Sequence, residues 1–227
     1  MNTRPNAVKV LCYGDSNTWG QKPDKTGRYA ANVRWTGLLQ NLLGDDFYIV
    51  EEGLGSRTTD LDYDRKPGRN GKTYLVPCIA SHIPVDIVIV MLGTNDLKME
   101  YSRTAQEIST AIRVLVDDIR RYGTDNEGKA PKIILISPIL IDDKAPRFTE
   151  FYTGYYDNRS MQESLKLAQA IKEIAETNEC KFINAADVAH PGEDGIHFSE
   201  DSNKPLAELI ASGIRNIDDR HPEILQK

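Results

Sequence analysis

The chain has 227 residues, of which 40% are hydrophobic and 27% are charged. This length and composition suit one domain with a substantial buried core. The net charge of −6 argues against nucleic acid or an anionic membrane surface as a partner, and no cluster of arginine and lysine contradicts this.

The three cysteines, Cys12, Cys78 and Cys180, are far apart in the sequence. Their number and spacing fit neither a disulfide framework nor a metal site, so we expect reduced thiols. Residues 1–10 lack the apolar core of a signal peptide, and no apolar run approaches the length of a membrane span. We therefore predict a cytoplasmic protein. We also expect that it needs no metal or organic cofactor.

The first predicted element is a strand within residues 8–20, VKVLCYGDSNTWG. Its apolar run stops at Gly14, where a glycine permits a sharp turn and leaves Ser16 exposed at the end of the strand. Amides of a following helical turn could then stabilise an oxyanion beside the hydroxyl. A serine in an ordinary connecting loop is the alternative.

Further along the chain, strand and helix patterns alternate. Helical spacing over 35–43 is followed by a strand over 47–50, a polar loop over 60–73 and a short helix over 74–83. The continuous apolar run 85–92 suits a central parallel strand. Thr104 and Glu107 form a capping box for a helix that continues to about residue 122.

The second half continues this alternation. We predict a strand over 133–136, a helix capped by Ser160 and Glu163, a short strand at 182–183 and a closing helix over 206–214. In the helix that follows Ser160, Leu165, Ala168, Ile171 and Ala175 are expected on one buried stripe. The order predicts an α/β fold, a three-layer α/β/α sandwich around a five-stranded parallel doubly wound sheet.

Ligand sites of such sheets lie beyond the carboxyl ends of the strands. Loops leaving those ends carry Ser16, Ser56 and Asn95, so these residues should converge. Asn95 has two possible roles, as the cap of a helical turn or as an amide donor to a substrate oxyanion. Ser56 would contribute only its backbone N–H.

A serine nucleophile needs a base and a third group that orients the base. His82 and His221 lie in contexts that favour structural or solvated roles, and His190 shares with Asp187 the spacing of the pair that follows. In Asp194-Gly195-Ile196-His197, that spacing lets the carboxylate reach Nδ1 and leaves Nε2 for a serine proton. An ordinary loop hydrogen bond is the alternative.

Four blocks, GDS at 14–16, the turn 53–59, GTND at 93–96 and DGIH at 194–197, resemble in order and spacing those of the SGNH, or GDSL-type, hydrolases. The longer stretches GDSNTWG, VRWTGLL, EEGLGSRTT, MLGTND and DGIHF are similar to the bacterial arylesterase/acyltransferase branch. The resemblance implies the flavodoxin-like SGNH fold over the whole chain, with Ser16 as nucleophile, His197 as base and Asp194 as its orienter.

It also implies an oxyanion hole made by the amides of Ser16 and Ser56 and the side chain of Asn95. The expected reaction is hydrolysis of short-chain acyl or aryl esters through an acyl-serine intermediate, with acyl transfer to alcohols or peroxide as a further activity. The residues expected to contact substrate lie within or next to these motifs and are Asn17, Thr94, Lys98 and Ile196. Two positions depart from the family pattern, since Asn17 replaces the usual Leu and Ser56 replaces a Gly or Ala.

The long connection 142–159 carries five aromatic residues, Phe148, Phe151, Tyr152, Tyr155 and Tyr156. Exposed aromatic residues mark interfaces, whereas rings tucked onto their own core do not. The branch that the chain resembles tends to oligomerise, so we predict a homo-oligomer in which this segment forms a subunit contact and narrows the substrate entrance.

Two other functions remain open. The same triad serves a carbohydrate O-deacetylase, and the polar residues Asn17, Arg57 and Lys98 would suit a sugar. A non-catalytic flavodoxin-like module could instead bind a nucleotide or flavin at the same edge of the sheet. The sequence Gly53-Leu54-Gly55 lacks the third glycine of a dinucleotide fingerprint, and no phosphate-binding Gly-x₄-Gly-Lys occurs, which disfavours that module.

Overall fold

The computed structural model describes residues 4–218, and His221, discussed above, lies outside the described residues. Five parallel strands form one sheet in the order β2-β1-β3-β4-β5. The strands are β1 (Val8–Gly14), β2 (Phe47–Gly53), β3 (Ile87–Met91), β4 (Lys132–Ser137) and β5 (Lys181–Asn184). The expected α/β class and five-stranded parallel sheet are confirmed.

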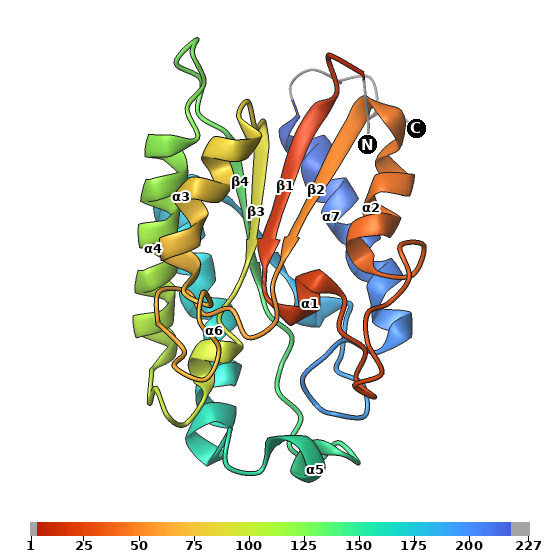
Figure 1. Ribbon diagram of the computed structural model, residues 1–227, viewed down its shortest axis with the longest axis vertical. Coiled ribbons are helices and arrows are strands. Elements are labelled where there is room, and N and C mark those ends of the chain that lie inside the picture. Colours follow the sequence, from red (N-terminus) through yellow and green to blue (C-terminus); the bar gives the residue numbers. More distant parts are fainter. Residues whose placement is uncertain (1–3, 219–227) are drawn as a thin grey trace.

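Helices cover both faces of the sheet (Figure 1). The helices are α1 (Ser16–Trp19), α2 (Trp35–Leu43), α3 (Gly71–His82), α4 (Ala105–Tyr122), α5 (Phe148–Tyr152), α6 (Asn158–Thr177) and α7 (Asn203–Ile217). Residues of α3, α4 and α6 pack on one face, and residues of α2 and α7 pack on the other. The short helices α1 and α5 lie at the edge where the strands end (Figure 1).

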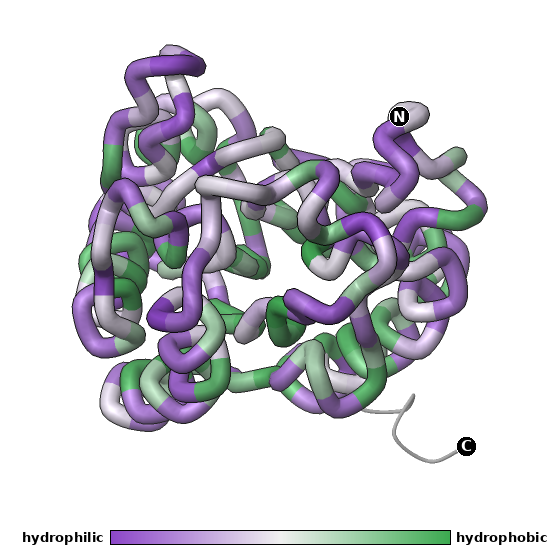
Figure 2. Tube along the Cα trace, turned by 90° about the horizontal axis from the view of Figure 1, so that it is seen from below, coloured by the Kyte–Doolittle hydropathy of each residue, from purple (hydrophilic) through white to green (hydrophobic). Residues whose placement is uncertain are grey.

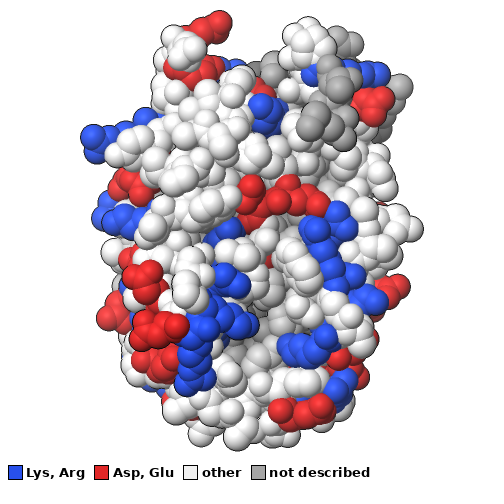
Figure 3. Space-filling view, in the orientation of Figure 1, with Lys and Arg blue, Asp and Glu red and all other residues white. Residues whose placement is uncertain are grey.

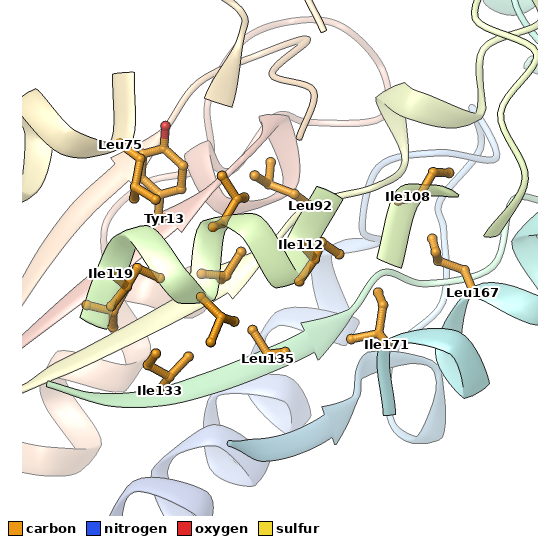
Figure 4. Packing of buried hydrophobic residues seen from close by; sticks show 14 of the residues in the cluster. Tyr13, Leu75, Leu92, Ile108, Ile112, Ile119, Ile133, Leu135, Leu167 and Ile171 are labelled. Carbon is orange, nitrogen blue, oxygen red and sulfur yellow. The ribbon is translucent and has the colours of Figure 1, made fainter. Parts of the chain in front are cut away.

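The two faces of the sheet bury separate apolar clusters. On the α4 side, Ile112 and Ile119 pack with Leu135 of β4 and Ile171 of α6 (Figure 4). Seen from the edge where the strands end, the helices alternate hydrophilic and hydrophobic segments along the chain (Figure 2), as amphipathic helices do. Within residues 4–218, no helix has both the length and the apolar character needed to cross a membrane.

Several predicted boundaries agree with the structure. Helix α2 covers the predicted residues 35–43, and Thr104 and Glu107 form the expected capping box of α4. Helix α3 begins at Gly71 rather than at residue 74, because the side chain of Asn70 caps it. The loop before it is correspondingly shorter.

The predicted start of α6 is wrong. Asp157 is the N-cap and forms the capping box with Ser160, so the helix begins at Asn158. Glu163 instead accepts a hydrogen bond from the backbone N–H of Ala105 in the neighbouring helix, at 2.8 Å. The buried stripe is also shifted, since Leu165 is 67% exposed while Leu167 is buried.

The connection 142–159 is not an exposed aromatic loop. It contains α5, and Phe148 and Tyr156 are buried while Phe151, Tyr152 and Tyr155 are half-buried. The rings pack on one another, with centroids 5.7–6.4 Å apart, and on the core of the α4 side. The segment therefore gives no support to the predicted subunit contact, and the oligomeric state stays a prediction.

Gly53 at the end of β2 is required by close packing. A Cβ there would lie 2.1 Å from the backbone nitrogen of Trp19 in α1. We expect Gly53→Ala to lower the free energy of unfolding by about 1–3 kcal/mol, because backbone atoms must move to admit a methyl group. Urea denaturation measures this change.

Gly55 provides the matched control, since a Cβ at that position meets no atom within 4 Å. Gly55→Ala should leave the urea midpoint close to that of the wild type. Equal midpoints for both variants would contradict the tight packing of α1 against the end of β2.

Candidate active site

The turn after β1 presents Ser16 at the edge where the strands end. Ser16 is the first residue of α1, and the carboxylate of Asp15 caps this turn by accepting the N–H of Asn17 at 2.9 Å. At Gly14 a Cβ would lie 2.0 Å from Oγ1 of Thr18, so only glycine lets the helical turn close directly on the strand. The local sequence thus fixes the direction of the serine hydroxyl.

The loop before α7 presents the imidazole. Oδ1 of Asp194 accepts the backbone N–H groups of Ile196 and His197, at 3.0 and 2.8 Å. Gly195, which lies between Asp194 and Ile196, has φ +75°, and a Cβ there would lie 2.1 Å from the carbonyl oxygen of Asp142. A glycine in this turn is therefore needed for the carboxylate to reach the histidine three residues later.

Ser16, His197 and Asp194 form a continuous chain of contacts. Nε2 of His197 lies 2.9 Å from Oγ of Ser16, and Nδ1 lies 2.6 Å from Oδ2 of Asp194. Asp194 is fully buried and His197 is 6% exposed. Nδ1 carries the proton that Asp194 accepts, so the free lone pair of Nε2 faces the serine hydroxyl.

The protonation of this pair reflects burial and charge. Burial lowers the pKa of His197, whereas its hydrogen bond to Asp194 raises it; the net direction is downward. Burial raises the pKa of Asp194, but the hydrogen bonds and charges of His197 and Lys25 outweigh this and hold the pKa well below the usual range. Asp194 is therefore an anion and His197 is a neutral base at neutral pH.

The side chain of Asn95 contacts Asp15 and Arg57, which are the sequence neighbours of Ser16 and Ser56. Nδ2 of Asn95 donates to the carbonyl oxygen of Arg57 at 3.1 Å and lies 3.4 Å from Oδ2 of Asp15. Ser16 and Asn95 follow β1 and β3, the adjacent strands at which the strand order reverses. Within residues 4–218, neither the N–H of Ser16 nor that of Ser56 has a hydrogen-bond acceptor.

Hydrogen bonds to the buried carboxylate of Asp96 hold the loop that carries Ser56. Both oxygens of Asp96 accept the N–H of Thr59 at 3.1 Å, and Arg103 lies 3.2 Å from Oδ1. Burial raises the pKa of Asp96 to about 6 and that of Asp15 to about 7. Ser56 itself has φ +66°, which turns the backbone at this point of the loop.

Of the residues predicted to contact substrate, Asn17 has another task. Its Nδ2 donates to the carbonyl oxygen of Ile196 at 3.1 Å, and its Oδ1 accepts the N–H of Phe198 at 3.0 Å. The side chain thus ties the turn of Ser16 to the loop of His197. Ile196 is itself buried in the core.

Arg57 is also structural. Its Nη1 donates to the carbonyl oxygens of Gly14, at 2.8 Å, and Glu52, and its guanidinium lies 4.2 Å from the centroid of the Tyr13 ring. The expectation that it faces a sugar is therefore not supported. Its contacts hold the end of β1 against β2.

Thr94 and Lys98 retain polar groups that the described residues leave available. Oγ1 of Thr94 is buried and has no hydrogen-bond partner within residues 4–218. Lys98 is 5% exposed, and its ammonium lies 4.3 Å from the centroid of the Tyr63 ring. Burial lowers the pKa of Lys98 to about 8.

The other Asp-x-x-His sequence forms no such chain. Nε2 of His190 lies 3.6 Å from Asp201, and Nδ1 lies 3.2 Å from Oγ of Ser199. Asp187 accepts instead from the side chain of Asn184, at 2.6 Å. The two Asp-x-x-His sequences have the same spacing, but only the loop of Asp194 brings the carboxylate to its histidine.

Sequence reasoning missed two site residues, Lys25 and Tyr152. Nζ of Lys25 lies 2.6 Å from Oδ2 of Asp194, and the hydroxyl of Tyr152 lies 3.3 Å from the same oxygen. The cluster of aromatic residues in its segment predicts a subunit contact for Tyr152 and not a contact with the triad. No sequence pattern distinguishes Lys25 from other loop lysines.

One group among residues 4–218 has the composition of a metal site. Glu52, Cys78 and His82 place ligand atoms within 4.8 Å of one another between β2 and α3. It contains none of the candidate residues. The expectation that no cofactor is required stays a prediction.

The charged surface and the hollows of the molecule do not by themselves locate the site. Figure 3 shows acidic atoms in the middle of one face with basic atoms on both sides. Among the ion pairs of the described residues, Arg28 and Arg34 pair with Glu51. A hollow of about 1040 Å³ is lined by residues such as Lys9 and Pro84, near the starts of the strands. It includes none of the candidate residues, which are brought together by the contacts described above.

Comparison with known proteins adds independent information. The profile of the GDSL-like lipase/acylhydrolase family matches residues 12–204. The structure of the native M. smegmatis aryl esterase is 38% identical, with a TM-score of 0.84, over 93% of this chain and all of that one. A carbohydrate acetylesterase from Sinorhizobium meliloti is 37% identical, with a TM-score of 0.82, over 92% of this chain and 99% of that one.

A curated relative, the acetylxylan esterase of Xylanibacter ruminicola, is 27% identical over 93% of this chain. The chain spans only 44% of the length of that relative. The similar structures, in contrast, are matched over almost their whole length.

Proposed function

Because the chain belongs to the GDSL-like lipase/acylhydrolase family, we propose that it is a serine esterase that hydrolyses short-chain acyl or aryl esters. The observation that carries this proposal is the contact of 2.9 Å between Oγ of Ser16 and Nε2 of His197, continued at 2.6 Å to Asp194. A nucleophile, a base and an orienting carboxylate in this order are the elements of acyl transfer through a serine.

In the first step, Oγ of Ser16 attacks the ester carbonyl carbon while Nε2 of His197 takes the serine proton. The negative charge on the carbonyl oxygen is stabilised by the amides of Ser16 and Ser56 and by Nδ2 of Asn95. When the tetrahedral intermediate collapses, the imidazolium gives its proton to the departing alcohol and the acyl-serine remains.

In the second step, His197 takes a proton from a water molecule that attacks the acyl-serine. The acid is then released and the proton returns to Oγ of Ser16. An alcohol or a peroxide that replaces this water would receive the acyl group, which is the acyl transfer expected for this branch. Thr94 and Lys98 are proposed to contact the substrate beside the oxyanion hole.

A carbohydrate O-deacetylase is the second candidate. Two of the similar proteins bear such names, the carbohydrate acetylesterase of Sinorhizobium meliloti and the acetylxylan esterase of Xylanibacter ruminicola. The loss of Asn17 and Arg57 as substrate contacts removes part of the argument from polar residues, since both hold the backbone. Ser16 would be the nucleophile in either case.

A panel of esters separates the two candidates. We expect kcat/KM for p-nitrophenyl acetate and short-chain aryl esters to exceed that for acetylated xylo-oligosaccharides, measured at the same pH with acetate release as the common readout. The reverse order would assign the chain to carbohydrate deacetylation. Hydrolysis of neither class would contradict the proposed function, and a binding module would then gain support.

A further inference from the structure

A lysine from a distant loop contacts the acid–base pair. Lys25 lies in the loop between α1 and α2, and its Nζ is 2.6 Å from Oδ2 of Asp194 and 3.1 Å from Nδ1 of His197. It also contacts the hydroxyl of Tyr152, which lies 3.3 Å from both of these atoms. Because Nδ1 donates its proton to Asp194, the approach of Lys25 to the ring is a contact between a charge and the imidazole.

The loop backbone has a defined turn at Lys25. Lys25 has φ +63°, a conformation that residues other than glycine rarely adopt. The turn is closed by the N–H of Lys25, which donates to the carbonyl oxygen of Lys22 at 3.1 Å, and by Asp24, which accepts the N–H of Thr26 at 2.8 Å. The turn thus fixes the backbone conformation from which the Lys25 side chain reaches Asp194.

Aromatic rings from another segment support the ammonium group. Nζ lies 4.5 Å from the centroid of the Tyr152 ring and 5.1 Å from that of Phe151. These residues belong to α5, which follows β4. Cation–π contacts and a buried carboxylate together hold the ammonium group where it reaches both members of the pair.

Several charged groups act on the pair and on Lys25. Besides Asp194, the charged groups that act on Lys25 include Arg147 and Lys66. His197 interacts electrostatically with Asp194 and Lys25, and Asp15 acts on the adjacent hydroxyl of Tyr152. Lys25 is thus the positive charge that opposes a proton on His197, while Asp194 favours it.

We propose that Lys25 is a positioning residue that fixes Asp194 and places a positive charge against the imidazole of His197. This role rests on the proposed esterase function. The imidazolium and the ammonium group share one carboxylate oxygen, so each positive charge disfavours the other. The consequence is a base that stays available at lower pH, with a weaker affinity for the proton that it must carry.

The test is the dependence of kcat/KM on pH for the wild type, Lys25→Met, Lys25→Gln and Lys25→Arg. A unit charge about 3 Å away in a medium like water changes a pKa by about one unit. We expect the acid limb to move up by about one pH unit in Lys25→Met and Lys25→Gln. Lys25→Arg, which keeps the charge, should hold the limb near that of the wild type.

Lys22→Met is the matched control, because Lys22 belongs to the same loop but its ammonium lies 6.0 Å from the centroid of the Tyr29 ring. A residue that only anchors the loop would lower activity at every pH and leave the acid limb in place. An unmoved limb in Lys25→Met, or an equal movement in Lys22→Met, would overturn the proposal.

Titration of the His197 ring by NMR gives a second readout that needs no turnover. The imidazole pKa should rise in Lys25→Met and Lys25→Gln and stay near the wild-type value in Lys25→Arg. An unchanged titration in the first two variants refutes the role of Lys25. Absence of esterase activity in the wild type would instead refute the proposed function, so the two failures can be told apart.

Discussion

Ser16→Ala is expected to lower kcat/KM for p-nitrophenyl acetate by about 10⁴–10⁶-fold, because the variant has no atom that can form the acyl intermediate. The amides of the oxyanion hole and the His197–Asp194 pair remain, so a small rate above the uncatalysed reaction should persist. Initial rates at saturating and limiting substrate measure the loss in kcat/KM and the residual rate. Burst kinetics in the wild type report the acyl intermediate.

Ser81→Ala is the control for the loss of a hydroxyl. Ser81 lies in α3, where its Oγ donates to the carbonyl oxygen of Cys78 at 2.8 Å, away from the candidate site. This variant should hydrolyse the ester at the wild-type rate. A Ser16→Ala enzyme that retained comparable activity would show that another group performs the attack.

Asp194→Asn is expected to lower kcat by about 10³–10⁴-fold while leaving substrate binding largely intact. An asparagine can keep Oδ1 as the acceptor for the N–H groups of Ile196 and His197. Its amide then faces Nδ1 as a donor, which places the imidazole proton on Nε2 and removes the free base that faces Ser16. The loss should therefore appear in kcat rather than in KM.

Asp187→Asn is the matched control, since Asp187 has the same spacing to His190 as Asp194 has to His197. Its carboxylate accepts only from Asn184 among the contacts described, and we expect nearly unchanged kinetics. Circular dichroism of both variants checks the fold. A large loss in Asp187→Asn together with a small one in Asp194→Asn would exchange the roles that we assign to the two pairs.

Regular elements could be predicted from sequence where local signals agree. The capping box of Thr104 and Glu107 and the apolar spacing from Ile108 to Ile119 both indicate α4, and the helix follows them. In α6 two overlapping capping patterns compete, Asp157 with Ser160 and Ser160 with Glu163. The second pattern does not form, because the carboxylate of Glu163 accepts the N–H of Ala105 instead. Only the packing of α4 against α6 creates this contact.

The candidate site could be assembled in outline because parallel strands end at one edge. This reasoning brought Ser16 and Asn95 together, and the Asp-x-x-His spacing added His197. It could not distinguish a polar side chain that faces substrate from one that holds backbone, as Asn17 does. Lys25 was missed for a related reason, since its position depends on a loop conformation that has no periodicity.

Covalent labelling with a fluorophosphonate tests the central claim most directly, because such reagents react with a serine that a neighbouring base activates. Intact mass spectrometry followed by peptide mapping should find a single adduct per chain on Oγ of Ser16. Labelling should vanish in Ser16→Ala and slow strongly in His197→Ala. An adduct on a different residue, or undiminished labelling of Ser16→Ala, would contradict the assignment of Ser16 as the nucleophile.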